Sequence, residues 1–71
     1  MHAGQRVEVV EGPLQGERAT IVPYPGTQKW QDRGWVWIRF DREGARVILP
    51  AGTSTALVQQ WFQMSGIREM R

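Results

Sequence analysis

This 71-residue chain has no cysteine and only one histidine, His2. Without cysteine it forms neither a disulfide framework nor a Cys-based zinc site, and a lone histidine near residue 1 supplies neither a His-based metal cluster nor a Ser-His pair. No apolar run approaches the roughly 20 residues of a membrane-spanning helix. No glycine-rich phosphate loop precedes a helix. We therefore expect a non-enzymatic protein with no catalytic residue, no metal and no cofactor, and the lack of cysteine favours a cytoplasmic location.

The net charge is also small, because nine basic and seven acidic residues leave only +2. Eight of the nine basic residues are arginine, whose planar guanidinium suits phosphates and aromatic faces. This balance gives mild support for a polyanionic partner. Tryptophan, in contrast, is unusually frequent for so short a chain, with four copies.

Alternating apolar and polar residues, separated by Gly and Pro turn signals, predict several short strands. The expected strands are Arg6–Val10, Ala19–Val22, Trp35–Phe40 and Ala45–Leu49. Such a series predicts an all-β, mainly antiparallel fold, a small barrel of four to five strands. We expect this barrel over residues 4–64, after a disordered leader at 1–3 and before a flexible polar tail at 65–71.

The segment Ala56–Met64 has two interpretations. Its apolar residues form a helical stripe, with Gly66 as a stop signal; they are Leu57, Val58, Trp61 and Phe62. The barrel pattern instead predicts a short 3-10 turn near Ser54–Leu57 and a last strand over Val58–Phe62. We favour the second interpretation, so the domain has a short helix or 3-10 turn near its C-terminus.

A resemblance to a known family supports the barrel. The stretch Gly4-Gln-Arg-Val-Glu-Val-Val-Glu-Gly-Pro-Leu-Gln-Gly16, continued by Glu17-Arg-Ala-Thr-Ile-Val22, resembles the KOW motif. The resemblance covers a third of the chain and implies an SH3-like barrel. Members of that family typically contact RNA or protein through the loops of the motif, which implies that Gln15, Glu17 and Arg18 lie near a contact edge. Glu17 departs from the pattern, since basic residues are usual there.

A second resemblance concerns the type II plasmid dihydrofolate reductases, also small SH3-like barrels, which build one active site in the pore of a tetramer. The similar segments are Gly4–Val7, Gln15-Gly16 and Val47–Pro50. That resemblance implies an enzyme as a minor alternative. In place of the Gln and Tyr of that family's pore strand, this chain has Ile48 and Leu49.

The strand Trp35–Phe40 offers the clearest candidate surface, because its period of two sends alternate side chains to opposite faces. Three medium apolar residues fill a small barrel better than two indoles and a guanidinium, so the inward set is Val36, Ile38 and Phe40. The outward set is Trp35, Trp37 and Arg39. Such a row suits stacking of unpaired bases, with Arg39 stacking or pairing with phosphate. Alternatively, the segment Trp61–Phe62 or another subunit covers the two indoles, or the row binds another ligand or a peptide.

The expected hairpin loop Pro23–Gly34 adds further candidates, namely Tyr24, Lys29, Trp30 and Arg33. An aromatic ring between two cations is typical of a contact with single-stranded nucleic acid or RNA. The alternative is that Tyr24 or Trp30 folds back to cap the barrel mouth.

The sequence thus predicts a small non-catalytic binding module whose partner is RNA or another single-stranded nucleic acid. The expected contact residues are Arg18, Tyr24, Lys29, Trp30, Arg33, Trp35, Trp37 and Arg39. The alternative is a protein-interaction or self-assembly module, including a homo-oligomer, that uses the same Trp face.

Overall fold

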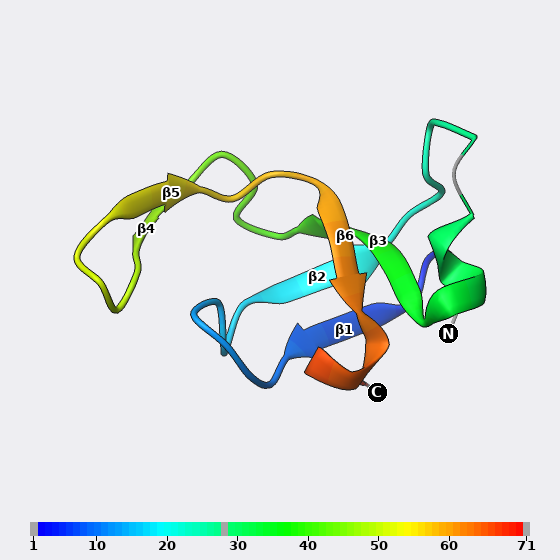
Figure 1. Cartoon of the computed structure of the whole chain (residues 1–71), viewed down its shortest axis with the longest axis horizontal. Coiled ribbons are helices and arrows are strands. Elements are labelled where there is room, and N and C mark those ends of the chain that lie inside the picture. Colours follow the sequence, from blue (N-terminus) through cyan, green and yellow to red (C-terminus); the bar gives the residue numbers. More distant parts are fainter. Residues whose placement is uncertain (1, 28, 71) are drawn as a thin grey trace.

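The computed structural model describes residues 2–27 and 29–70, and these residues form short strands and two 3-10 turns (Figure 1). The strands are β1 (Arg6–Val9), β2 (Arg18–Ile21), β3 (Trp35–Phe40), β4 (Arg46–Ile48), β5 (Ser54–Ala56), β6 (Gln60–Gln63) and β7 (Ile67–Glu69). The 3-10 turns are η1 (Trp30–Arg33) and η2 (Met64–Gly66). Met1, Gln28 and Arg71, which belong to the predicted leader, loop and tail, lie outside the described residues.

Within the described residues, no helix has the length and hydrophobicity that crossing a membrane would require.

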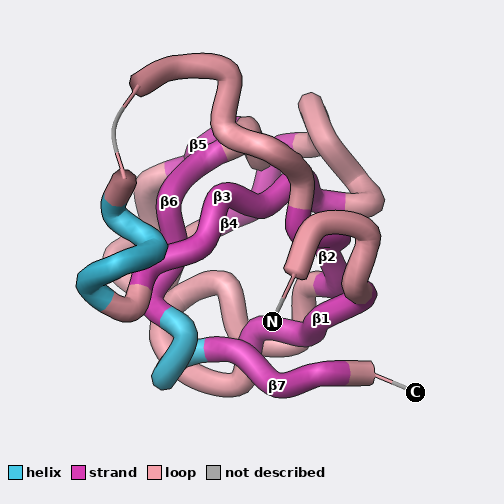
Figure 2. The backbone as a smooth tube through the Cα atoms, turned by 90° about the vertical axis from the view of Figure 1, so that its right-hand side faces the viewer, coloured by secondary structure: helices cyan, strands magenta, loops and turns pink. Residues whose placement is uncertain are grey.

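The larger sheet has the strand order β6-β3-β2-β1-β7 with every neighbouring pair antiparallel, and it curls into a half-barrel (Figure 2). A separate antiparallel ribbon pairs β4 with β5. The predicted all-β, mainly antiparallel small-barrel fold is confirmed. The strands predicted from residues 6, 19, 35 and 45 agree with β1, β2, β3 and β4 to within one residue at each end.

The first hairpin follows directly from its sequence. In β1, Val7 and Val9 are buried while Arg6 is exposed and Glu8 half-buried, as alternation requires. Gly16 closes the turn with φ 94° and donates its N–H to the Val9 carbonyl at 2.8 Å. A side chain with a Cβ is disfavoured at that φ, so glycine is needed for β2 to return beside β1.

The predicted 3-10 turn near Ser54–Leu57 is wrong in position, because β5 occupies residues 54–56 in extended form. Gly52, with φ 88°, donates its N–H to the Leu49 carbonyl, and the Leu49 N–H donates to the Thr53 carbonyl. This tight turn returns the chain antiparallel to β4. The resulting hairpin projects from the body of the molecule (Figure 1), in keeping with a radius of gyration of 11.9 Å, above the roughly 11 Å of a compact chain this long.

The last predicted strand, Val58–Phe62, corresponds to β6 but begins at Gln60 and ends at Gln63. The helical interpretation of Ala56–Met64 is wrong, because Phe62 packs against the core while Trp61 faces the other side of the sheet, a period of two. The 3-10 turn near the C-terminus is η2, which follows β6 directly.

The segment after η2 differs from the predicted polar tail. β7 pairs with β1 along the register Val9↔Ile67 and Val7↔Glu69, and the two strands lie side by side (Figure 2). Ile67 is 6% exposed and joins the core. At the other end of the chain, in the predicted leader, the N–H of His2 is within reach of the Gln5 side-chain oxygen.

The core fills the concave side of the curled sheet. Its buried members are Val7, Val9, Ala19, Ile21, Val36, Ile38, Phe40, Leu57 and Ile67. The predicted inward set of β3 is therefore confirmed, with exposures of 6%, 0% and 1% for Val36, Ile38 and Phe40. Since a chain this short buries only about 60% of its unfolded surface, each of these side chains matters to stability.

We predict that Ile67→Ala lowers the free energy of unfolding by about 2–5 kcal/mol, because it empties a buried site. The matched control is Ile48→Ala, which makes the same change at a side chain that is 80% exposed and should alter stability by less than about 0.5 kcal/mol. Urea denaturation at low protein concentration measures both. Equal effects would mean that β7 is not part of the folded core.

Candidate functional site

The outer face of the large sheet carries two neighbouring rows of side chains that the strand register sets up. In the polar row, Thr20 lies between Arg6 on β1 and Arg39 on β3. The adjacent row on the same face holds Trp37 of β3 opposite Trp61 of β6. Since residues two apart on a strand share a face and lie roughly 6–7 Å apart, aromatic and cationic groups are direct neighbours on β3.

Five aromatic rings pack together around the Trp37–Trp61 pair. We call them the aromatic cluster: Tyr24, Trp30, Trp35, Trp37 and Trp61. They comprise all four tryptophans and the single tyrosine of the chain. Centroid separations between contacting rings run from 4.6 to 5.8 Å. Aromatic pairs at such distances contribute about 0.5–1.5 kcal/mol each beyond the area they bury. The cluster therefore stabilises the fold as well as forming a surface.

The centre of the cluster is the cross-strand pair Trp37–Trp61, with ring centroids 5.5 Å apart. The Met64 N–H donates to the Gly34 carbonyl at 2.8 Å, so this is a hydrogen-bonded pair of the β3–β6 ladder. Hydrogen-bonded and non-hydrogen-bonded pairs alternate along an antiparallel ladder, which makes Trp37–Trp61 a non-hydrogen-bonded pair. Side chains approach most closely at such positions, and this explains the tight contact.

Two rings reach the cluster from the connection between β2 and β3. Tyr24 lies with its ring 4.6 Å from Trp37 and 4.7 Å from Trp61. Trp30 opens η1 and lies 5.6 Å from Trp35 and 5.8 Å from Trp61, the second contact nearly parallel at 26°. Trp30 is 40% exposed, whereas the other four rings are half-buried. The cluster therefore presents Trp30 most openly to solvent.

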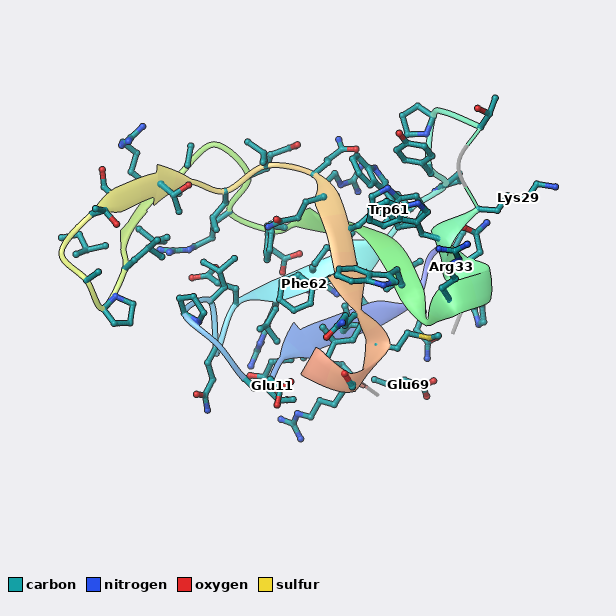
Figure 3. The ribbon with its side chains drawn as sticks, viewed as in Figure 1. Glu11, Lys29, Arg33, Trp61, Phe62 and Glu69 are labelled. Atoms are coloured by element: carbon teal, nitrogen blue, oxygen red, sulfur yellow. The ribbon has the colours of Figure 1, made fainter. Side chains whose placement is uncertain are left out.

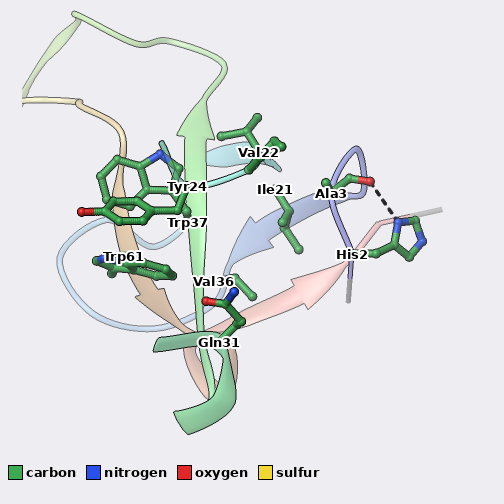
Figure 4. Close-up of a pocket in the computed structure, with 10 residues that line it drawn as sticks. His2, Ala3, Ile21, Val22, Tyr24, Gln31, Val36, Trp37 and Trp61 are labelled. Carbon is green, nitrogen blue, oxygen red and sulfur yellow. Dashed lines mark hydrogen bonds between the residues drawn. The ribbon is translucent and has the colours of Figure 1, made fainter. Parts of the chain in front are cut away.

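An open cleft of about 220 Å³ lies beside the cluster (Figure 4). Tyr24, Trp37 and Trp61 form its aromatic side, and Gln31 of η1 extends its amide between Trp61 and Val36. The volume lies below the roughly 300–1,000 Å³ of small-molecule sites. The cleft thus suits a single planar ring at the edge of a larger ligand better than a whole small molecule.

Indole N–H groups supply the hydrogen-bonding capacity of the cluster. Trp37 Nε1 donates to Gln59 Oε1 at 3.1 Å. The buried Nε1 of Trp61 has no hydrogen-bond partner in the part of the chain that the structure describes. An unsatisfied buried donor costs about 1–3 kcal/mol in typical cases, so Trp61 carries a stability cost at its place on the outer face.

Cationic groups flank the cluster on the side of the polar row. Arg6 donates two hydrogen bonds to the carboxylate of Asp41 and a third, at 2.8 Å, to Thr20 Oγ1. The hydrogen bond from Arg6 is the main cause that lowers the pKa of Asp41; desolvation opposes it, and the charges of Arg6, Arg18 and Arg39 each add a smaller lowering effect. The same contact raises the pKa of the Arg6 guanidinium. Arg6 and Asp41 offset each other, so the net positive charge of the polar row comes from Arg39.

Arg18 and Arg39 make no ion pair with any described residue, whereas Arg42 and Arg68 are paired with Glu17 and Glu8. Both unpaired side chains are exposed. Arg39 is two residues from Trp37 on the same face. Arg18 lies opposite Glu8, one row further from the cluster. The structure therefore brings Arg39 to the rings and leaves Arg18 at a distance.

The opposite flank of the cluster carries the remaining predicted cations. Lys29 precedes η1 and Arg33 is in its last turn, and both are exposed. Figure 3 shows the two side chains at the η1 end of the molecule, on the Trp61 side. The cluster is thus bordered by positive charge at both ends.

Of the eight predicted contact residues, seven lie in or next to the cluster, namely Tyr24, Lys29, Trp30, Arg33, Trp35, Trp37 and Arg39. Trp61 was expected only as cover for the β3 indoles, and the structure makes it the ring that three others contact. Gln31 and Gln59 were not expected at all. The sequence Gln60-Trp-Phe-Gln63 holds two adjacent aromatic residues and no alternation, so it gave no signal for the position of Trp61.

Among the side chains that the structure describes, no group of three or more His, Cys, Asp or Glu residues is placed to hold a metal ion. His2 borders the cleft, where its ring Nδ1 is 3.0 Å from the Ala3 carbonyl oxygen (Figure 4).

We compared the chain with models of protein families, with curated proteins and with solved structures, and none of the three comparisons found a match. Function must therefore be inferred from the chemistry of the site, because small barrels serve many unrelated tasks.

The lowered pKa of Asp41 predicts an acid-sensitive contribution to stability. A carboxyl whose pKa is depressed by folding stabilises the protein above its unfolded pKa of about 3.9, and this stabilisation is lost as the pH falls through the folded value. Asp41→Asn should therefore flatten the loss of thermal stability between about pH 5 and pH 2. The effect should be small, because the two side chains are 44% and 40% exposed.

The control for this prediction is Glu43→Gln, in the same turn, whose carboxylate makes no ion pair with a described residue. Thermal unfolding followed by circular dichroism measures both variants. If Asp41→Asn and Glu43→Gln shift the pH profile equally, the Arg6–Asp41 contact is not the cause.

Proposed function

We propose that this chain is a small non-catalytic module that binds single-stranded nucleic acid, RNA foremost, through the aromatic cluster and the cations beside it. The observation that supports this proposal is that, on one sheet face, a half-exposed aromatic surface adjoins Arg39, whose guanidinium pairs with no described residue. A cytoplasmic location, expected from the lack of cysteine, fits such a partner.

Stacking would supply the sequence-tolerant part of the affinity. Every base has a π face, and a base stacked on an aromatic side chain contributes about 1–3 kcal/mol. Trp30 is the ring most open to a base, and the cleft beside Tyr24 and Trp61 has room for a planar ring. In a duplex the bases are already stacked on each other, so an unpaired strand is the better ligand for such a surface.

Phosphate contacts would supply the rest of the binding affinity. Arg39 on one flank and Lys29 and Arg33 on the other place positive charge at both ends of the rings, so a backbone could run across the cluster. Arginine binds phosphate with two parallel hydrogen bonds, which fixes the strand's position without reading its sequence. A net charge of only +2 predicts modest affinity and strong weakening by salt.

We predict that Trp30→Ala weakens binding of a mixed-sequence RNA or DNA oligonucleotide about 5–150-fold, the equivalent of losing one stacked base at about 1–3 kcal/mol. Fluorescence anisotropy of the labelled oligonucleotide measures this without relying on tryptophan emission. The fold should survive, because Trp30 is the most exposed ring of the cluster. Unchanged affinity in a folded variant would contradict the stacking role.

We predict that Arg39→Ala reduces the slope of log affinity against log salt by about one, because one phosphate contact is lost. The matched control is Arg46→Ala, an exposed arginine of β4 whose side chain donates to Ser54 Oγ on the projecting hairpin. The control should leave the slope unchanged. Equal slopes for both variants would show that binding is not localised at the cluster.

Three further experimental results would each contradict the proposed function and favour a different one. Tight binding of duplex in preference to single strands would exclude stacking as the basis of recognition. A stable oligomer with blue-shifted emission that no oligonucleotide alters would favour a protein interface on the Trp face. Turnover of dihydrofolate with a nicotinamide cofactor would favour the enzyme alternative.

A further inference from the structure

A groove of about 250 Å³ runs along one edge of β6. All four residues of the strand, Gln60–Gln63, line it. Because successive side chains point to opposite faces of a sheet, a groove that touches all four must lie at the strand's edge and not on a face. Glu11, Gly12 and Gly66 form the opposite wall, and Figure 3 shows Glu11 on the side of Phe62.

This edge carries unpaired peptide groups. β6 is the outermost strand of its sheet and pairs only with β3 in the described chain. Since Met64 is hydrogen-bonded to Gly34, alternation directs the N–H and C=O of Trp61 and the N–H of Gln63 away from β3 and towards the groove. The Gln63 C=O accepts the first hydrogen bond of η2. An edge with three free peptide groups is still a template for another strand.

The projecting β4–β5 hairpin offers a second unpaired edge. The Leu49 N–H donates to the Thr53 carbonyl and the Leu57 N–H to the Ala45 carbonyl. By the same alternation, the peptide groups of Arg46 and Ile48 point away from β5. Ile48 is 80% exposed, the most exposed large apolar side chain among the described residues, and the hairpin stands clear of the body (Figure 1).

The two edges are complementary in chemistry. The groove combines apolar rings, those of Trp35, Trp61 and Phe62, with the carboxylate of Glu11. The edge of β4 combines the apolar side chain of Ile48 with the guanidinium of Arg46. Neither Glu11 nor Arg46 forms an ion pair with a described residue.

We propose that β4 of one copy of this chain adds to the free edge of β6 in a second copy, with Ile48 against the aromatic wall and Arg46 near Glu11. The free peptide groups of the two edges would then pair, as in strand addition. The contact joins two different surfaces, so it is head-to-tail and builds a ring or an open chain of copies. It shares Trp35 and Trp61 with the aromatic cluster, whereas Lys29, Trp30 and Arg39 take no part in it, so the two proposals are tested with different variants.

The experiment is sedimentation velocity of the full chain from micromolar to millimolar concentration, with Gln63→Pro as the diagnostic variant. Gln63 has φ −68° and ψ 134°, which proline adopts without strain. Its N–H faces the groove, so proline removes an intermolecular donor and no internal hydrogen bond. Association should weaken about tenfold, while the melting temperature of the monomer stays equal or rises.

Ile48→Ser tests the partner strand and should also weaken association. Val58→Ser is its control, since Val58 is 54% exposed but lies outside both edges. Reversing the charges tests the ion pair: Glu11→Arg and Arg46→Glu should each weaken association, and the double variant should restore it.

A chain that stays monomeric at every concentration overturns the proposal. So does association that Gln63→Pro abolishes and Ile48→Ser leaves intact, because β6 would then pair with an edge other than β4, such as another β6. Oligonucleotide binding by Gln63→Pro is measured in parallel and should equal that of the unmodified chain, so failure of either proposal is seen separately.

Discussion

The alternation of side chains along β3 is the constraint on which the rest of the molecule depends. Val36, Ile38 and Phe40 take up the concave side and hold the small core together, and this leaves Trp35, Trp37 and Arg39 no place but the outer face. A register shift of one residue would exchange the two sets and put a guanidinium in the core. The strength of the core therefore fixes the position of the outer rings, and the candidate site follows from the packing.

The parts of the fold that depend on local pattern could be predicted from the sequence. The alternation of β1 and β3 and the Gly-Pro turn at Gly12 are readable because strand faces and turn conformations are set within a few residues. The inward and outward faces of β3 are equally local, so the outward placement of Trp35, Trp37 and Arg39 was predictable too. Tyr24 and Trp30 were identifiable as loop residues beside cations, although not as members of one cluster.

The parts that depend on distant pairing could not be read in this way. Trp61 meets Trp37 only through the register of two strands 24 residues apart in sequence, and a short apolar run fits a helix as well as a strand. β5 and β7 have three residues each, too few for a period to show. Ile67 in the sequence is one apolar residue among polar ones, and only its pairing with Val9 makes it part of the core.

A small domain with a narrow stability margin would be more stable if its large aromatic rings were fully buried. In this chain the rings of the aromatic cluster remain half-exposed on one face. Mutual stacking explains part of this arrangement, since each ring shields its neighbours. It does not explain why Trp30 is held on η1 with 40% of its surface open, or why Arg39, which pairs with no described residue, lies beside Trp37. A purely structural cluster would not require the neighbouring cation, whereas a surface that receives a stacked, negatively charged strand uses both. The guanidinium next to the rings is thus the feature that favours binding over packing as the reason for this face.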